Sequence, residues 1–194
     1  MSREKKNIVE LTRCSLADYR AMRKLPLRVL ADNVRSMHNI GSMFRTSDAF
    51  RIEEVILGGI SGIPPHPEIS KTALGADESV AWRHVADSVA EVERLKAGGW
   101  TICALEQAHD SIPLQDFRPG AAENRLLLVV GNEVNGVDQR IVSMADHVFE
   151  IPQEGTKHSL NVAASAAIAL FHLYQCASSQ LVAIPDEAVK VTAP

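Results

Sequence analysis

Short apolar runs recur along most of this chain and predict a series of buried β-strands. The clearest is Leu126–Val130, where five consecutive apolar residues lie between Arg125 and Gly131. Shorter runs predict further strands at residues 27–30, 55–57, 80–82, 100–105 and 147–151. A strand that is apolar throughout, instead of at every second position, is typical of a parallel sheet covered on both faces.

Helical patterns lie between these runs. Asn39 or Ser42 is expected to cap one helix, and Asp87 another. The last helix, apolar almost all round, is expected to begin at Ser159 and to continue to about Gln175, and shorter helices are expected at residues 70–74 and 137–144. The alternation of strands and helices predicts an α/β fold with a mostly parallel sheet and helices on both faces.

Length and composition indicate one globular domain with short extensions. The chain has 194 residues, 46% of them hydrophobic, and we divide it into a basic arm at 1–26, a core domain at 27–176 and a tail at 177–194. Every apolar run is too short for a membrane span, and the charged N-terminus does not read as a secretory signal. Three widely spaced cysteines argue against a disulfide framework or a cysteine zinc site, and they favour a cytoplasmic protein.

Charge is distributed unevenly along the chain. The net charge of −4 argues by itself against a nucleic-acid-binding protein. Residues 1–28, however, hold eight Lys or Arg against three Asp or Glu, a net of +5, while the remaining 166 residues have a net of −9. Such asymmetry indicates an anionic partner for the basic arm, although a solvated helix face explains the charge equally well.

Three polar segments are candidates for chemistry. In residues 33–46, two Asn and two Arg flank the start of a helix, where backbone N–H groups favour anions and an Arg fork can grip phosphate. In residues 131–136, the strand is followed by G-x-E-x-x-G, which is not the dinucleotide-binding fingerprint. In residues 151–161, a polar loop leads into the last helix. Each segment alone could equally have a purely structural role, as a helix cap, a turn or a connecting loop.

Known short motifs for other chemistries do not occur in the sequence. It contains no Walker A motif, no nucleophile elbow and no His/Cys set with metal-ligand spacing. We therefore expect no metal site.

Taken together, the three segments resemble, in order and spacing, the three motifs of the SpoU/TrmH family within the SPOUT class of RNA methyltransferases. The resemblance covers about residues 27–175. The first motif is matched by Asn33, Arg35, Asn39, Gly41, Arg45 and Thr46. The second is matched by Gly131, Glu133 and Gly136, and the third by Ile151, Pro152, Gly155, Ser159, Leu160, Asn161 and Val162.

The resemblance implies a fold, a cofactor and an assembly. The family's C-terminal third is threaded into a deep trefoil knot, formed here by the loops at 131–136 and 151–161. S-adenosylmethionine is expected to bind in this knot, and a homodimer is expected through the same region. The family's cofactor-contacting positions map onto Leu105, Gly131, Ile151, Ser159 and Leu160.

The resemblance also implies methyl transfer to a ribose 2′-hydroxyl of tRNA or rRNA. The implied catalytic residues are Asn39, Arg45, Glu133, Ser159 and Asn161. A guanidinium with a pKa above ~12 is a poor base. We therefore expect Arg45 to orient the substrate phosphate and to stabilise negative charge on the ribose oxygen. The expected RNA contacts are Arg35, Arg45 and, from the basic arm, Arg20, Arg23 and Lys24.

Two alternatives remain open at this point. One is a SPOUT enzyme that methylates an RNA base, although the motif around Arg45 argues against it. The other is a catalytically inactive knotted protein that only binds RNA, although the intact motif residues argue against such decay.

Overall fold

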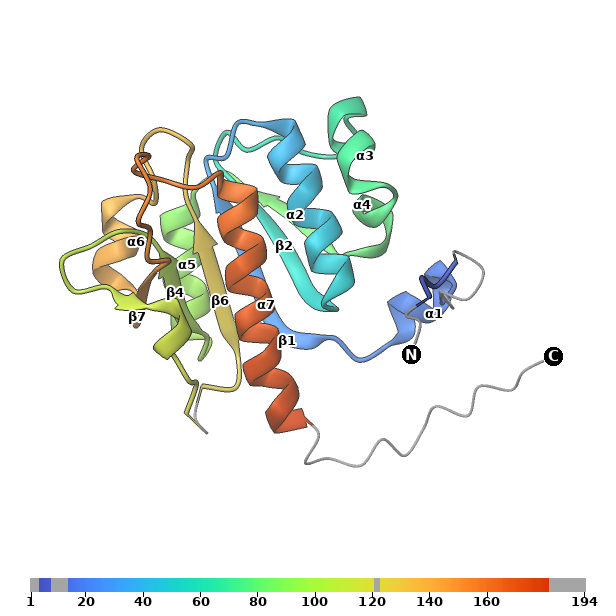
Figure 1. Ribbon diagram of the computed structural model, residues 1–194. Coiled ribbons are helices and arrows are strands. Elements are labelled where there is room, and N and C mark those ends of the chain that lie inside the picture. The colour runs from blue at the N-terminus through green and yellow to red at the C-terminus, as the bar shows by residue number, and fades with distance from the viewer. Residues whose placement is uncertain (1–3, 8–13, 121–122, 182–194) are drawn as a thin grey trace.

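The computed structural model describes residues 4–7, 14–120 and 123–181 (Figure 1). Within these residues, seven strands form one sheet in the order β3-β2-β1-β6-β4-β7-β5, and every hydrogen-bonded pair of neighbours is parallel. This confirms the predicted α/β class. The strands are β1 (Leu25–Asp32), β2 (Ile52–Gly58), β3 (Trp82–Val85), β4 (Thr101–Leu105), β5 (Ile112–Pro113), β6 (Leu126–Val130) and β7 (His147–Glu150).

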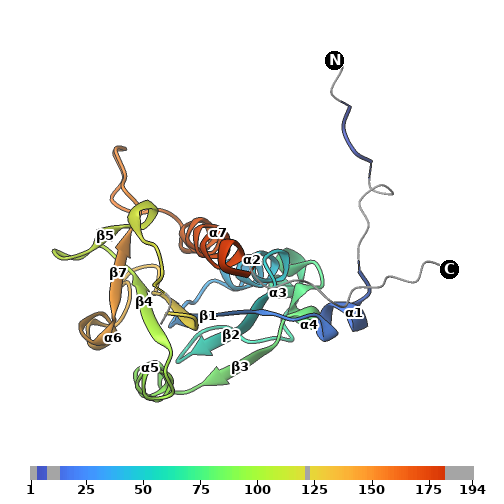
Figure 2. The ribbon, with the colours of Figure 1, turned by 90° about the horizontal axis from the view of Figure 1, so that it is seen from below.

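Helices cover both faces of the sheet, as the apolar runs predict (Figure 2). Figure 2 shows α2, α3, α4 and α7 on one face and α5 and α6 on the other. The helices are α1 (Leu16–Ala21), α2 (Met37–Ala49), α3 (Pro67–Ala73), α4 (Ala76–Ser79), α5 (Ser88–Ala97), α6 (Gln139–Met144) and α7 (Val162–Leu181), with a short 3₁₀ helix at Leu114–Asp116.

Strand β6 lies near the middle of the sheet and supplies both halves of the core. Leu126, Leu128 and Val130 pack with the residues of α2 and α7, while Leu127 and Val129 pack with those of α5 and α6. All five side chains are buried because successive side chains of a strand point to opposite faces. The uninterrupted apolar run is therefore explained by two covered faces.

Several strand boundaries differ from the sequence-based expectation, and the starts of β1 and β3 have a clear physical reason. Strand β1 begins at Leu25, before Pro26, because the Leu25 amide bonds the Arg51 carbonyl and the register shifts just after the proline. A shift of this kind tolerates a proline that cannot donate to the ladder. Strand β3 begins at Trp82 because the Val80 amide is used to close helix α4.

Helix starts also differ from the expectation, and for α2 and α7 the difference changes which residue is the cap. Helix α2 is capped by Ser36, whose hydroxyl accepts from the Asn39 amide, and not by Asn39 or Ser42. Helix α7 is capped by Asn161 and not by Ser159, because the Asn161 side chain accepts from the amides of residues 163 and 164. Helix α7 also continues beyond the predicted end at Gln175. The domain division and the knot stay predictions, and residues 182–194 lie outside the described part of the chain.

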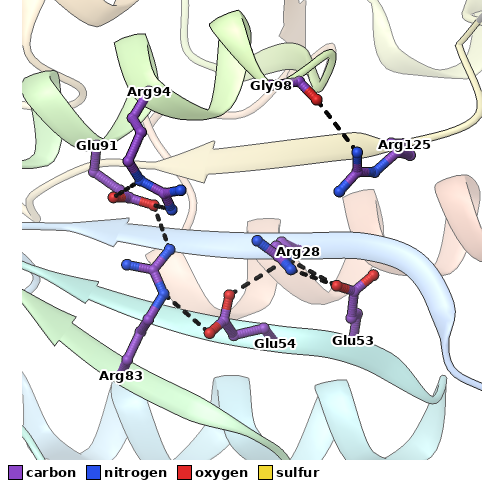
Figure 3. A network of polar contacts seen from close by, with 8 residues as sticks. All are labelled: Arg28, Glu53, Glu54, Arg83, Glu91, Arg94, Gly98 and Arg125. Carbon is purple, nitrogen blue, oxygen red and sulfur yellow. Dashed lines mark hydrogen bonds and ion pairs between the residues drawn. The ribbon is translucent and has the colours of Figure 1, made fainter.

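A ladder of ion pairs joins three strands to α5 (Figure 3). Arg28 of β1 contacts Glu53 and Glu54 of β2, and Arg83 of β3 connects Glu54 to Glu91 of α5. Arg94 then holds Glu91 through two hydrogen bonds of 2.9 and 2.7 Å. The Arg28 guanidinium also lies 4.3 Å from the ring centre of Trp100. One cation of the basic N-terminal region is thus used inside the fold.

Glu91 is the buried centre of this ladder, and its removal is expected to destabilise the fold. Burial raises the pKa of Glu91, but hydrogen bonds from Arg94 and Arg83 outweigh it and hold the pKa below its usual value. Glu91→Gln should lower the free energy of unfolding in urea by about 2 kcal/mol, because two arginines lose their shared charge partner. The control is Glu93→Gln on the exposed side of the same helix, which should stay within about 0.5 kcal/mol of the parent.

Candidate functional site

A cavity of about 440 Å³ opens where β4, β6 and β7 end and α7 begins. Its walls come from the segment after β4, the turn after β6 and the loop between β7 and α7. The carboxyl ends of parallel strands are where α/β proteins bind ligands. All five predicted cofactor positions, Leu105, Gly131, Ile151, Ser159 and Leu160, line this cavity.

The turn after β6 is closed tightly on itself. Asn132 and Gly136 exchange two backbone hydrogen bonds of 3.0 and 2.9 Å. A Cβ atom on Gly131 would lie 2.0 Å from the carbonyl carbon of Gly136, and Gly136 itself has a φ of +68°. Both glycines of the second motif are therefore required for steric reasons. Because they have no side chains, the turn presents its backbone directly to the cavity.

Glu133, from the same turn, reaches across to the start of α2. Its carboxylate accepts hydrogen bonds from the amides of Arg35 (3.1 Å) and Ser36 (3.0 Å) and from the Asn39 side chain (3.0 Å). Partial burial raises the pKa of Glu133, but these N–H groups outweigh it and hold the pKa below the usual value. Glu133 thus fixes the first motif to the second.

Asn39 continues this hydrogen-bond chain to the third motif. Its side-chain oxygen accepts from the Asn161 side chain at 3.1 Å, and Asn161 in turn caps α7. Because Ser36 provides the cap of α2, the Asn39 side chain is free to connect Glu133 with Asn161. The structure therefore joins three of the predicted catalytic residues directly, from segments far apart in the sequence.

The other two predicted catalytic residues have different surroundings. Ser159 is exposed in the loop before α7 and lines the cavity. Arg45 is exposed on α2, is not among the residues that line the cavity, and has no hydrogen bond or ion pair with any described residue. Arg35 is likewise exposed, and its guanidinium contacts no described partner. Two unpaired guanidiniums thus remain available to an anion.

The basic arm contributes fewer free cations than its sequence suggests. Arg20 donates to the Glu78 carbonyl at 2.6 Å, and Lys24 donates to the Tyr19 carbonyl and lies over its ring. Arg23 is exposed and has no described partner. The buried Tyr19 donates to the Asp48 carbonyl at 3.0 Å, which fixes α1 to the end of α2. Arg3 and Arg13 lie outside the described residues.

Comparison with known proteins fits this geometry. The profile of the SpoU rRNA Methylase family matches residues 26–171. The chain belongs to this family. A SpoU relative from Staphylococcus haemolyticus, assigned to the TrmH family of tRNA/rRNA methyltransferases, is 26% identical over 147 residues, which are 76% of this chain and 57% of that protein. The chain thus spans about three fifths of the length of such relatives.

Solved SpoU structures share the fold. The TrmH/SpoU tRNA modifying enzyme of A. aeolicus has a TM-score of 0.76 and 26% identity, covering 90% of this chain and 88% of that one. The SpoU methyltransferase AviRb of Streptomyces viridochromogenes, solved in complex with AdoMet, has a TM-score of 0.70 and 26% identity, covering 84% of this chain and 64% of that one.

None of the helices in the described part of the present chain combines the length and apolarity that a membrane crossing requires.

Several polar residues in and around this SpoU site were not predicted from the sequence motifs. Glu106, which follows β4, lines the cavity and accepts from the amides of Gln107 (3.0 Å) and Val137 (2.9 Å). Asp32, buried at the end of β1, accepts from the Asp138 amide at 3.0 Å. Asn132 donates to the Asn33 carbonyl at 2.7 Å. Their common signal is a polar side chain at the carboxyl end of an apolar strand or within two residues of it.

Glu133 should make the stability of this SpoU protein sensitive to acid. Because its pKa is lowered in the folded state, its stabilising contribution is present above the usual value of 4.5 and is lost as the pH falls through the folded value. Glu133→Gln should lower the free energy of unfolding at neutral pH by about 1 kcal/mol, since the carboxylate is partly exposed. In urea unfolding, the variant should also lose less stability than the parent between neutral pH and acid pH. An equal acid dependence would contradict this role.

Proposed function

We propose that this chain transfers a methyl group from S-adenosylmethionine to a ribose 2′-hydroxyl of tRNA or rRNA. One observation carries the proposal. The second and third motif segments line one cavity, and the hydrogen bonds from Glu133 through Asn39 to Asn161 fix that cavity to the helix of the first motif, which presents Arg45. Family membership and the AdoMet complex of AviRb support it.

The cavity suits the proposed methyl donor in shape and charge. Leu105, Ile151 and Leu160 offer apolar walls for an adenine ring, and pockets of a few hundred Å³ are typical of small-ligand sites. The cavity lining includes three glutamates, among them Glu106 and Glu150, and no Lys, Arg or His. Such a lining complements a sulfonium cation. When bound, S-adenosylmethionine would supply an electrophilic methyl group on that sulfur.

Arg45 is proposed to hold the RNA side of the reaction. Its guanidinium would pair with a substrate phosphate and stabilise the negative charge that develops on the ribose oxygen. The reacting oxygen, the methyl carbon and the sulfur must lie in line, so positioning supplies much of the rate enhancement. Glu133 and Asn39 position the helix for this task, and Asn161 and Ser159 position the donor loop.

A homodimer through the knot region is part of the proposal. The outward face of α7, the helix that follows the proposed donor loop, exposes Ile168 (45%) and Phe171 (47%). Exposed apolar side chains on one helix face favour a self-complementary contact. Sedimentation of the parent and of Phe171→Ser tests this contact, because loss of the interface would shift the variant to the mass of a monomer.

Three measurements test the proposed reaction. Titration calorimetry measures S-adenosylmethionine binding, and transfer of a labelled methyl group to RNA measures activity. A 2′-O-methyl group protects the adjacent phosphodiester bond from alkali, whereas a base methyl group does not. Absence of donor binding would favour the inactive RNA-binding alternative, and alkali-sensitive product would favour base methylation.

The arm is proposed to contact RNA phosphates, with Arg23 as its exposed cation that has no partner among the described residues. Deletion of the arm would also remove the buried Tyr19, so substitution is the cleaner test. Arg23→Gln should reduce the slope of log affinity for single-stranded RNA against log salt by about 0.7, which is the contribution of one lost phosphate contact. Arg140→Gln is the control, because Arg140 already pairs with Asp138. A slope equal to that of the parent would contradict the role.

A further inference from the structure

Two large aliphatic side chains are exposed in the loop between β2 and α3. Ile60 is 59% exposed and Ile63 is 47% exposed, although they flank the buried Ser61. An exposed apolar side chain alone needs no explanation. This pair is unusual because the backbone that carries it is firmly fixed.

The loop is fastened to the first motif by side chain and backbone. The Ser61 hydroxyl donates to the Ala31 carbonyl and accepts from the Val34 amide, both at 2.9 Å. The Ile60 amide donates to the Asn33 side chain at 3.2 Å. A Cβ atom on Gly62 would lie 2.1 Å from the sulfur of Met37, so the loop also packs closely against the start of α2. The two isoleucines are therefore held beside the segment that carries Arg35.

The stretches of chain that carry this pair and Arg35 contain no acidic residue. No Asp or Glu occurs between Asp32 and Asp48, a segment that contains Arg35 and Arg45, and none occurs between Glu54 and Glu68. Residues 29–194 as a whole, which include these stretches, have a net charge of −9. The exposed Arg35 guanidinium contacts no described residue. Apolar contact area thus lies beside an unpaired guanidinium, while the Glu133 carboxylate close to it is already held by the amides of Arg35 and Ser36.

We infer that Ile60 and Ile63 form a docking surface for an unpaired nucleotide of the RNA, next to the ribose that is methylated. The flat face of a base would rest on the two aliphatic side chains, and Arg35 would pair with the adjoining phosphate. Unpaired nucleotides expose their base faces, whereas bases in a duplex are stacked. An unpaired guanidinium beside apolar side chains favours a partner that carries a negative charge on every backbone unit over an uncharged apolar peptide. The inference rests on the proposed function, because it concerns the same RNA.

Single substitutions of the exposed side chains test the docking surface. Ile60→Ser and Ile63→Ser should each weaken binding of a fluorescein-labelled single-stranded oligouridine about fivefold, because each removes apolar contact area of roughly half an isoleucine side chain. Affinity for S-adenosylmethionine and the midpoint of thermal unfolding should not change. A 4-thiouridine probe should crosslink to the loop at residues 59–66 in the parent chain. The matched control is Ile112→Ser, at the opposite edge of the sheet.

Each outcome has one meaning. Unchanged oligouridine affinity in both variants, or crosslinks only outside this loop, would overturn the docking surface. A shift from dimer to monomer in the variants would also overturn it, because the isoleucines would then serve a protein contact. The parent protein is tested in parallel for donor binding and for RNA methylation. If both are observed, a negative result with the variants counts against the docking surface alone. If neither is observed, the proposed function itself has failed.

Discussion

Arg45→Lys is expected to slow methyl transfer about a hundredfold while the affinity for S-adenosylmethionine stays unchanged. A lysine keeps the positive charge but cannot present the planar fork that would hold a phosphate and the ribose oxygen together. Arg45→Ala should be slower still, by about a thousandfold. Because Arg45 is exposed and does not line the cavity, neither change should disturb the fold or the donor site.

The measurement is single-turnover methylation of RNA with a labelled donor, together with calorimetric donor binding. Arg51→Lys is the matched control, since Arg51 is also an exposed arginine and lies just beyond the end of the same helix. Undiminished turnover of Arg45→Lys would remove the proposed role. Weaker donor binding would instead indicate that Arg45 supports the cavity.

The sheet was predictable from the sequence because a strand that is buried on both faces has an uninterrupted run of apolar residues. Leu126–Val130 is a strand over the predicted residues, since every position in it must be apolar. Ion pairs between different elements have no comparable sequence pattern. The pair of Glu91 with Arg94 follows from their i,i+3 spacing on one helix, but nothing in the sequence indicates that Glu91 also pairs with Arg83, because that contact depends on how β3 and α5 lie together.

The sequence points to residues that the structure brings together at or near one cavity, but it does not indicate their local contacts. Ser36, Asn39 and Ser42 are all suitable N-caps, so local rules alone do not select among them. A partner 94 residues away decides the matter, because Glu133 binds the Asn39 side chain and leaves the cap to Ser36. The same tertiary effect makes Asn161, and not Ser159, the cap of α7. Motif spacing identified the candidate residues, whereas contacts between distant segments determine which of them cap helices and which connect the motifs.

Gly131→Ala is expected to damage both stability and donor binding. The added Cβ atom would meet the Gly136 carbonyl carbon at 2.0 Å and the Val137 nitrogen at 2.1 Å. Both atoms belong to the backbone of a turn closed by two hydrogen bonds, so they cannot move aside as a flexible side chain could. We expect the free energy of unfolding to fall by about 3 kcal/mol. The corresponding fall in the melting temperature is roughly 10 °C.

Gly155→Ala provides the matched comparison, because a Cβ atom at Gly155 meets nothing within 4 Å. Its unfolding free energy should stay within about 0.5 kcal/mol of the parent. Calorimetry should detect donor binding to Gly155→Ala and none to Gly131→Ala. A Gly131→Ala protein with parental stability but no donor binding would show that this glycine serves only the ligand's approach to the backbone. Parental stability together with parental donor binding would show that the turn can open, and the steric basis of the second motif would then be wrong.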